Sequence, residues 1–313
     1  MMTLSTLARP AVQGRGRLVP LNVVGTRRPH PYYRTVHRIG FSFDNRARSR
    51  SYQDAVNNRW LMRIFPLLLT LILAQSTPLL GAPSETRFFE MRTYYATPGK
   101  LDDLLARFRD HTLKIFEKHG MVNIGYWLPE TNSENKLIYL LAFPDRDARE
   151  KSWKAFFADP EWQSVAKESE RNGKLVAKVE SVFLAPTDYS PAVTPQSPEP
   201  PRIYELRTYQ AAPGKLDVLL ARFRDHTTSL FARHGMAQFG YWTPTEKKDG
   251  AGETLIYILA HKNREAWAES FKAFRSDPEW VKVKADSEAN GSLTVKDGVR
   301  SVLMVPTDFS PAK

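Results

Sequence analysis

The chain has 313 residues, a formal net charge of +11 and no cysteine. The lack of cysteine excludes disulfides, a thiol nucleophile, thiolate metal sites and a lipoprotein anchor. Residues 1–61 hold eleven Arg and only two acidic residues, which gives +9 of the total charge. The remainder is nearly neutral, so the charge of the folded part does not indicate a nucleic-acid partner.

The first predicted element is a signal-peptide-like segment at residues 62–82. A basic start at Arg63 precedes the apolar run 67–74, and small residues follow up to Ala82. This is the layout of a secretory signal, and its apolar part is too short to span a membrane comfortably. We expect translation to begin at Met62 and the mature protein to be secreted or periplasmic, without a stable membrane anchor. Residues 1–61 are then a non-native or disordered extension; a mitochondrial transit peptide, Arg-rich and acid-poor, is the alternative.

The rest of the chain is two copies of one sequence. Residues 87–127 align without a gap on residues 202–242, and 27 of these 41 positions are identical. The match resumes at Asp-Pro-Glu-Trp (159–162 and 277–280) and closes at Pro186–Pro191 and Pro306–Pro311. The period is that of a whole domain with its own core. The sequence therefore predicts domains at 87–186 and 202–306, joined by a Pro-rich linker at 187–201.

Each copy predicts the same order of elements. In the first copy, residues 88–95 alternate as a strand, and apolar residues from Leu101 recur at helical spacing up to a capping Gly120. The runs 121–128 and 136–142 form a predicted hairpin. A helix follows at 145–158, restarts with Asp159 as its N-cap, and is followed by a strand at 174–185.

This βαββαβ order is a split βαβ, ferredoxin-like unit of the α+β class. Its helices cover one face of an antiparallel sheet, and the other face needs a partner. Because the linker is long enough to cross a domain, we expect the two sheets to pack face to face within one chain. Tyr189 and Phe309 are expected to anchor arms that lie on a domain surface.

The ordered motifs of both copies resemble the NIPSNAP family. Each copy has Glu-Met/Leu-Arg-Thr-Tyr in its first strand (90–94 and 205–209), then Pro-Gly-Lys-Leu, His-Gly-Met, Gly-Tyr-Trp, Leu-Ile-Tyr and Asp-Pro-Glu-Trp. The resemblance implies two tandem NIPSNAP domains and the dimeric α+β barrel fold. It brings no agreed active-site residues. Animal members of the family are associated with mitochondria, which gives some support to the transit-peptide alternative for residues 1–61. The signal-peptide-like segment instead favours a bacterial, exported relative of the family.

Strand alternation predicts a ligand pocket. Glu90, Arg92 and Tyr94 share one face of the first strand, and the more apolar alternate residues are expected to face the helices. The polar face is then expected to line the space between the two sheets, together with Asn123 and Trp127 of the next strand. The second copy supplies Glu205, Arg207, Tyr209, Gln238 and Trp242. Aromatic walls with a few fixed polar groups are typical of ligand pockets; a structural Glu-Arg ion pair that holds the sheets together is the alternative.

The histidines suggest weaker candidates. His119 and His234 precede the capping glycines, which favours a core or capping role. His111 and His226 lie at the edge of the apolar stripe and are kept as second-rank site candidates. No histidine pair has metal-ligand spacing with a third ligand. The sequence predicts no metal site and no cofactor, and it contains neither a phosphate-binding glycine loop nor a nucleophile elbow.

Two functions follow from these observations. The first is an exported protein that binds a small molecule, or a cofactor-free enzyme, with its site between the sheets. The second is an interaction protein with a filled barrel, whose outer helices bind a protein partner. A cavity between the sheets favours the first, and a close-packed interior favours the second.

Overall fold

Each repeat folds as the predicted βαββαβ unit in the computed structural model, which describes residues 85–313. The first repeat contains β1 (Phe88–Ala96), α1 (Leu101–Arg107), α2 (Leu113–Lys118), β2 (Val122–Pro129), β3 (Lys136–Phe143), α3 (Arg146–Ala158), α4 (Pro160–Ser169) and β4 (Val176–Pro186). The second contains β5 (Ile203–Ala211), α5 (Leu216–Arg222), α6 (Thr228–Arg233), β6 (Ala237–Pro244), the short 3-10 turn η3 (Lys247–Asp249), β7 (Thr254–His261), α7 (Arg264–Ser276), α8 (Pro278–Ser287) and β8 (Thr294–Pro306). The expected export signal lies outside the described residues.

The first helix of each repeat contains a π-helical turn that its apolar pattern did not predict. The turn η1 (Phe108–Thr112) connects α1 to α2, and η2 (Phe223–Thr227) connects α5 to α6. At η1, the Thr112 hydroxyl donates to the carbonyl of Arg107 at 3.1 Å. Helix α2 ends at Lys118, and Gly120 follows its C-cap residue with a φ of 75°, which confirms the predicted left-handed cap.

The break between α3 and α4 is capped as predicted. Asp159 is the N-cap of α4; its carboxylate accepts from the amide of Glu161 at 2.8 Å, and Pro160 opens the helix. Asp277 and Pro278 repeat this arrangement at α8.

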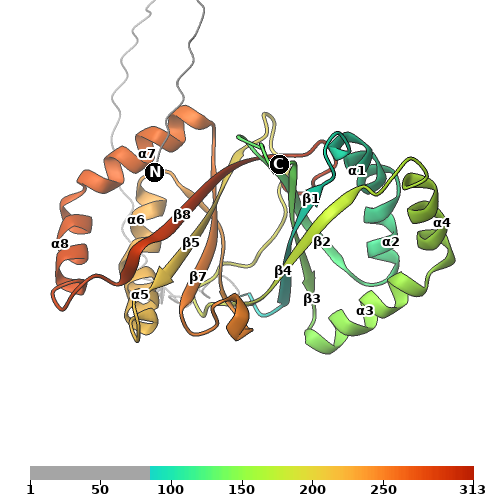
Figure 1. Ribbon diagram of the computed structural model, residues 1–313. Coiled ribbons are helices and arrows are strands. Elements are labelled where there is room, and N and C mark those ends of the chain that lie inside the picture. Colours follow the sequence, from blue (N-terminus) through green and yellow to red (C-terminus); the bar gives the residue numbers. More distant parts are fainter. Residues whose placement is uncertain (1–84) are drawn as a thin grey trace, which may run out of the picture. The chain divides into compact units, whose positions relative to one another are not determined.

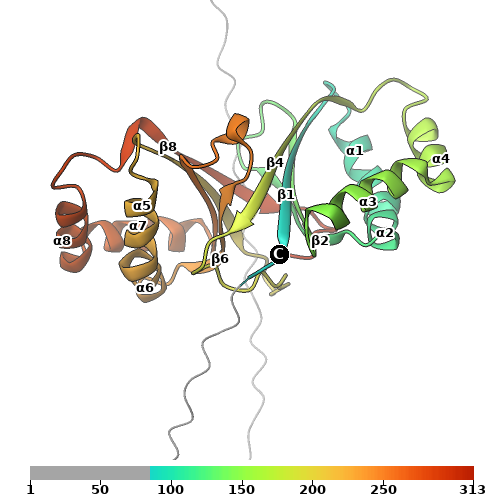
Figure 2. The ribbon, with the colours of Figure 1, turned by 90° about the horizontal axis from the view of Figure 1, so that it is seen from below.

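The strands form one closed barrel in the order β1-β3-β2-β8-β5-β7-β6-β4. The sheets are joined at both edges, because β4 pairs with β6 and β2 pairs with β8, all antiparallel. Face-to-face packing within one chain is thus confirmed, and backbone hydrogen bonds close it. Helices α1–α4 cover the outside of the first half and α5–α8 the outside of the second (Figures 1 and 2). No helix among residues 85–313 is long and apolar enough to cross a membrane.

The arms after β4 and β8 are exchanged between the repeats. The Ser190 hydroxyl accepts from the amide of Tyr241 at 3.0 Å, and the Tyr189 ring packs on that of Tyr241 at 5.4 Å. The C-terminal arm packs Phe309 on Tyr126 at 5.5 Å. The predicted anchors are confirmed, and each arm lies on the opposite repeat.

Candidate functional site

The predicted pocket face of the first strand points away from the barrel interior. Phe89 and Met91 are buried in the barrel core, whereas the alternate residues face the helices. The residues that face the helices are Glu90, Arg92 and Tyr94 in the first repeat and Glu205, Arg207 and Tyr209 in the second. The prediction that they line the space between the sheets was wrong. Alternation separates the two faces of a strand, but the interior of a closed barrel needs apolar side chains as much as the helix side does.

The second strand divides its predicted pocket residues between both faces. Trp127 and Trp242 are buried inside the barrel. Asn123 instead donates to the carbonyl of Leu113 on the helix side at 3.1 Å, and Gln238 donates to the carbonyl of Thr228 at 3.0 Å. The strand registers shift between positions 123 and 125 and between 238 and 240. These bulges change which face the next residues occupy, so simple alternation failed there.

Side chains fill the interior of the barrel. The rings of Trp127 and Tyr204 are 5.3 Å apart, and those of Phe89 and Trp242 are 5.5 Å apart. A Cβ atom at Gly125 would lie 2.2 Å from the Trp127 indole, so the indole itself occupies the space that this glycine leaves. The site expected between the sheets is therefore replaced by apolar packing, and the polar face of each first strand lies under the helices.

In the first repeat, this polar face is an ion cluster around a carboxylate that four side chains contact. The buried carboxylate of Glu90 accepts from Arg92 at 2.5 Å, from Trp153 at 2.7 Å and from Ser181 at 2.6 Å. Arg149 of α3 adds two hydrogen bonds, at 2.9 and 3.1 Å. Burial alone would raise the pKa of Glu90, but Arg149 and Arg92 outweigh it and hold the pKa below its ordinary value. The cluster joins the sheet to α3, so its role here is structural.

The corresponding carboxylate of the second repeat has fewer donors. Glu205 accepts from Arg207 at 2.6 Å and from Ser301 at 2.5 Å. The Nε2 atom of His261 lies 3.5 Å from Glu205 Oε2, which is longer than an ordinary hydrogen bond. Among residues 85–313, Glu205 Oε2 and both ring nitrogens of His261 have no hydrogen-bond partner. Burial raises the pKa of Glu205, but the approach of His261 to 3.5 Å, the charge of Arg207 and the hydrogen bond from Ser301 outweigh burial and lower the pKa.

Substitutions between the repeats explain this difference. Trp267 stands at the position of Arg149, and Phe271 stands at the position of Trp153. The second repeat has therefore lost a guanidinium and an indole that bind the carboxylate in the first. Phenylalanine is also smaller than tryptophan, so space opens above the second sheet.

A cavity of about 280 Å³ lies at this place in the second repeat. The sheet contributes Arg207, Tyr209, Thr294 and Val299 to its lining; η2, α5 and α6 contribute Arg222, Phe223, Thr227 and Phe231; and α7, α8 and the following loop contribute Phe271, Phe274, Arg275, Trp280, Lys284, Glu288 and Ser292. Six aromatic and five charged side chains line the cavity. The aromatic walls are those expected of a ligand pocket, but the lining carries more charge than expected. Of the predicted pocket residues, Arg207 and Tyr209 line this cavity.

The guanidinium of Arg207 is held by neighbouring side chains. Its Nε donates to the Tyr257 hydroxyl at 2.8 Å, and its Nη2 donates to the Tyr209 hydroxyl at 3.0 Å. Burial raises the pKa of Tyr257 well above its ordinary value, so this phenol stays protonated. With Glu205 on Nη1, the arginine forms a fixed, charge-balanced part of the cavity wall.

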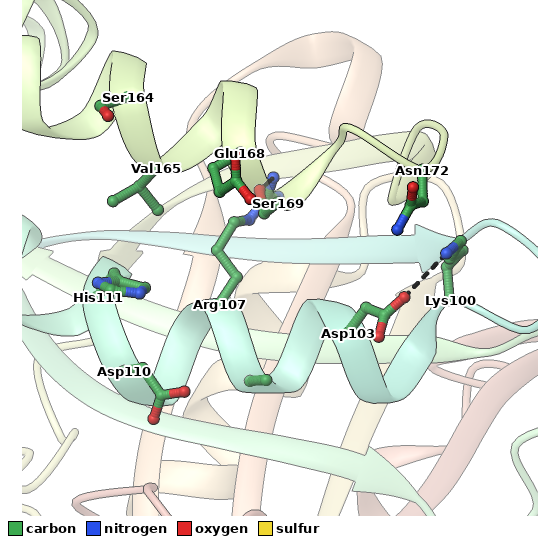
Figure 3. Close-up of a pocket in the computed structure, with 11 residues that line it drawn as sticks. Lys100, Asp103, Arg107, Asp110, His111, Ser164, Val165, Glu168, Ser169 and Asn172 are labelled. Atoms are coloured by element: carbon green, nitrogen blue, oxygen red, sulfur yellow. Dashed lines mark hydrogen bonds and ion pairs between the residues drawn. The ribbon is translucent and has the colours of Figure 1, made fainter.

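The second-rank histidines line two outer grooves. His111 belongs to a groove of about 460 Å³ between α1, η1 and α4, where Arg107 extends towards Ser169 (Figure 3). His226 lies in the matching groove of about 490 Å³ in the second repeat. Both histidines are exposed, and both grooves are open surface features lined mainly by polar side chains.

His119 and His234 are C-cap residues, as predicted, and each also contacts the N-cap of another helix, which was not predicted. His119 Nε2 lies 2.6 Å from the carboxylate of Asp159, and His234 Nε2 lies 2.8 Å from that of Asp277. Hydrogen bonds from Lys118 and His119 hold the pKa of Asp159 below its ordinary value. Within residues 85–313, no group of three or more His, Asp or Glu side chains is placed to hold a metal ion.

Sequence reasoning missed His261 and the cavity because it weighed the identities between the copies. The informative signal was the set of differences at otherwise matched positions. These differences are Phe143 against His261, Arg149 against Trp267, Trp153 against Phe271, Phe157 against Arg275 and Ala166 against Lys284.

Known proteins match both repeats. The NIPSNAP family model matches residues 89–191 and 204–311. A NipSnap homologue of Dictyostelium discoideum is 24% identical over 226 residues, covering 71% of this chain and 89% of the relative. Human NipSnap homologue 3A is 25% identical over 230 residues, covering 72% of this chain and 86% of the relative. A crystal structure of an uncharacterized NIPSNAP domain protein from Burkholderia xenovorans is 29% identical, with a TM-score of 0.30, and covers 33% of this chain and 98% of that one.

Proposed function

The chain belongs to the NIPSNAP family, with two tandem NIPSNAP domains, and we propose that it binds a small molecule in the cavity of its second domain. The observation that carries this proposal is the aromatic cavity of about 280 Å³ between the second sheet and its helices. This volume lies just below the range of about 300–1,000 Å³ for ligand pockets, so the ligand is smaller than a typical drug.

The contrast between the domains supports a ligand role for the second. Trp153 of the first domain packs under the Arg92 guanidinium at 4.5 Å and donates to Glu90 at 2.7 Å. Phe271 holds the same position in the second domain and lines the cavity. One copy therefore surrounds its buried carboxylate with four donor side chains, while the other has a phenylalanine and a cavity at the position of the tryptophan.

Binding is better supported than a reaction. Glu205 and His261, the buried acid and base of the second domain, are not among the residues that line the cavity. Arg207, which does line it, is already hydrogen-bonded to Glu205 and two tyrosines. Glu288, the one carboxylate that does line the cavity, is paired with Arg222 at 2.9 Å. A general base must reach the proton that it removes, and the ligand space contacts no unpaired carboxylate or histidine among residues 85–313.

Filling the cavity tests the proposal. Phe271→Trp places the first domain's residue in the second, where its indole is expected to occupy the cavity and approach Glu205. The control is Phe157→Trp, the same change at a side chain that is 57% exposed in the first domain. Phenylacetate, phenylacetamide, benzyl alcohol and hexanoate would be titrated by calorimetry. We expect saturable binding of at least one compound to the wild type and the control, and loss of that binding in Phe271→Trp. Equal binding to all three proteins, or binding to none, would contradict the proposal.

The second candidate is an interaction protein, which the filled barrel favours. Phe89, Trp127 and Trp242 pack the interior, as that function requires. The two outer grooves that hold His111 and His226 then offer matching helical surfaces to a protein partner. This alternative forecasts that no compound of the panel binds and that Phe271→Trp changes stability alone.

We further propose that the protein is exported, on the strength of the signal-like run at residues 62–82. N-terminal sequencing of protein from its native cell is expected to place the mature end between Thr77 and Ser84. A mature form that retains residues before Met62 would contradict export and favour the mitochondrial alternative.

A further inference from the structure

We propose that the ligand of the second-domain cavity is an organic monoanion, with an apolar body inside the cavity and a carboxylate at its mouth beside Arg275 and Lys284. This inference depends on the proposed binding function. It adds the chemical class of the ligand and its orientation.

The charges around the cavity are not balanced. Four cationic side chains and one carboxylate line it. Arg207 is paired with Glu205 at 2.6 Å, and Arg222 is paired with Glu288 at 2.9 Å. Arg275 and Lys284 make no ion pair with any residue between 85 and 313. Two positive charges are therefore left for an anion from solution.

Both uncompensated cations are specific to the second domain. Phe157 stands at the position of Arg275 in the first domain, where its ring stacks on Trp153 at 5.4 Å. Ala166 stands at the position of Lys284. One substitution at the rim removes a positive charge from the second domain, because Ser292 stands at the position of Lys174. The cavity and the pair of cations thus occur together in one copy, although the net charge of the rim rises by only one.

The positions of the charges orient the ligand. The rings of Phe223, Phe231 and Phe274 are almost fully buried and form the apolar inner wall. A carboxylate buried among them would lose its hydration without a free donor, because Arg207 is already engaged. Arg275 and Lys284 are exposed, so a carboxylate beside them keeps part of its hydration while it meets both cations.

The experiment compares phenylacetate with phenylacetamide, which has nearly the same shape and no charge. We expect the wild type to bind the anion about tenfold more tightly, a difference of about 1.4 kcal/mol, and this preference to shrink as salt is added. The double variant Arg275→Phe/Lys284→Ala carries the first domain's residues and is expected to bind both compounds equally. Lys282→Ala is the matched control, because it removes a charge from α8 at a residue outside the cavity lining.

Each outcome decides between the two proposals. Equal binding of acid and amide by the wild type, with loss of both in Phe271→Trp, would overturn the anion inference and leave the binding site in place. An anion preference that survives in the double variant would overturn the role of Arg275 and Lys284. If Lys282→Ala loses the preference for the anion to the same extent, the preference comes from the overall charge of the domain. The specific role of Arg275 and Lys284 would then be overturned. Failure of both compounds to bind the wild type would overturn the inference, and failure of benzyl alcohol and hexanoate as well would overturn the proposed function.

Discussion

Replacing the paired arginines is expected to affect the two domains unequally. Arg92→Met and Arg207→Met remove the same guanidinium, with 13% and 14% of the side chain exposed, from carboxylates that are fully buried. Breaking a buried ion pair costs about 3–5 kcal/mol when the remaining charge keeps no guanidinium or ammonium partner. Arg207→Met meets this condition, because Arg207 is the only guanidinium that contacts Glu205 among the described residues.

Arg92→Met does not leave its carboxylate without a cationic partner. Glu90 keeps Arg149 at 2.9 Å and the Trp153 indole at 2.7 Å. The loss is then closer to that of one hydrogen bond to a charged group, about 1.5–3 kcal/mol. The free energy of unfolding should therefore fall by about 2 kcal/mol more for Arg207→Met, the difference between the centres of the two ranges. This corresponds to a further decrease in Tm of about 4–8 °C in a protein of this size.

Urea unfolding of both variants at neutral pH measures the difference. The double variant Glu205→Gln/Arg207→Met removes the orphaned charge and should recover part of the loss. Equal losses, or a larger loss for Arg92→Met, would refute the reasoning that Arg149 and Trp153 compensate in the first domain. A negligible loss for Arg207→Met would instead identify an arginine kept for a ligand.

Three further predictions concern the fold. Gly125→Ala should lower the free energy of unfolding by about 1–3 kcal/mol, measured by urea titration, because its methyl group would meet the Trp127 indole. A single repeat, residues 85–191, should dimerise or aggregate in sedimentation velocity because its sheet lacks a partner, and a well-folded monomer would contradict this. Glu90 and Glu205 have pKa values below their ordinary 4.5, so their stabilisation is present above that pH and is lost as the pH falls through the lowered values. Glu90→Gln should accordingly lose less stability than the wild type between neutral and acid pH.

The sequence by itself determined the architecture. The duplication set two domains, and periodicity with turn and cap residues placed each strand and helix within a few positions. Asp159 and Gly120 were identified as caps because capping depends on a few neighbouring backbone groups. The bare sheet face implied a partner, and the tether made the second repeat that partner.

Only the tertiary structure decided which face of each strand lies inside the barrel and which lies under the helices. Glu90 and Arg92 lie under α3 because Arg149 and Trp153 reach them from about sixty residues away, and strand alternation carries no information about such distant partners. The register shift after Asn123 changed the face of β2 on which the following residues lie. The cavity arose in the same way, from several substitutions on separate helices that act together only where the fold brings them into contact. Local physical chemistry thus fixed the elements, and long-range packing fixed the site.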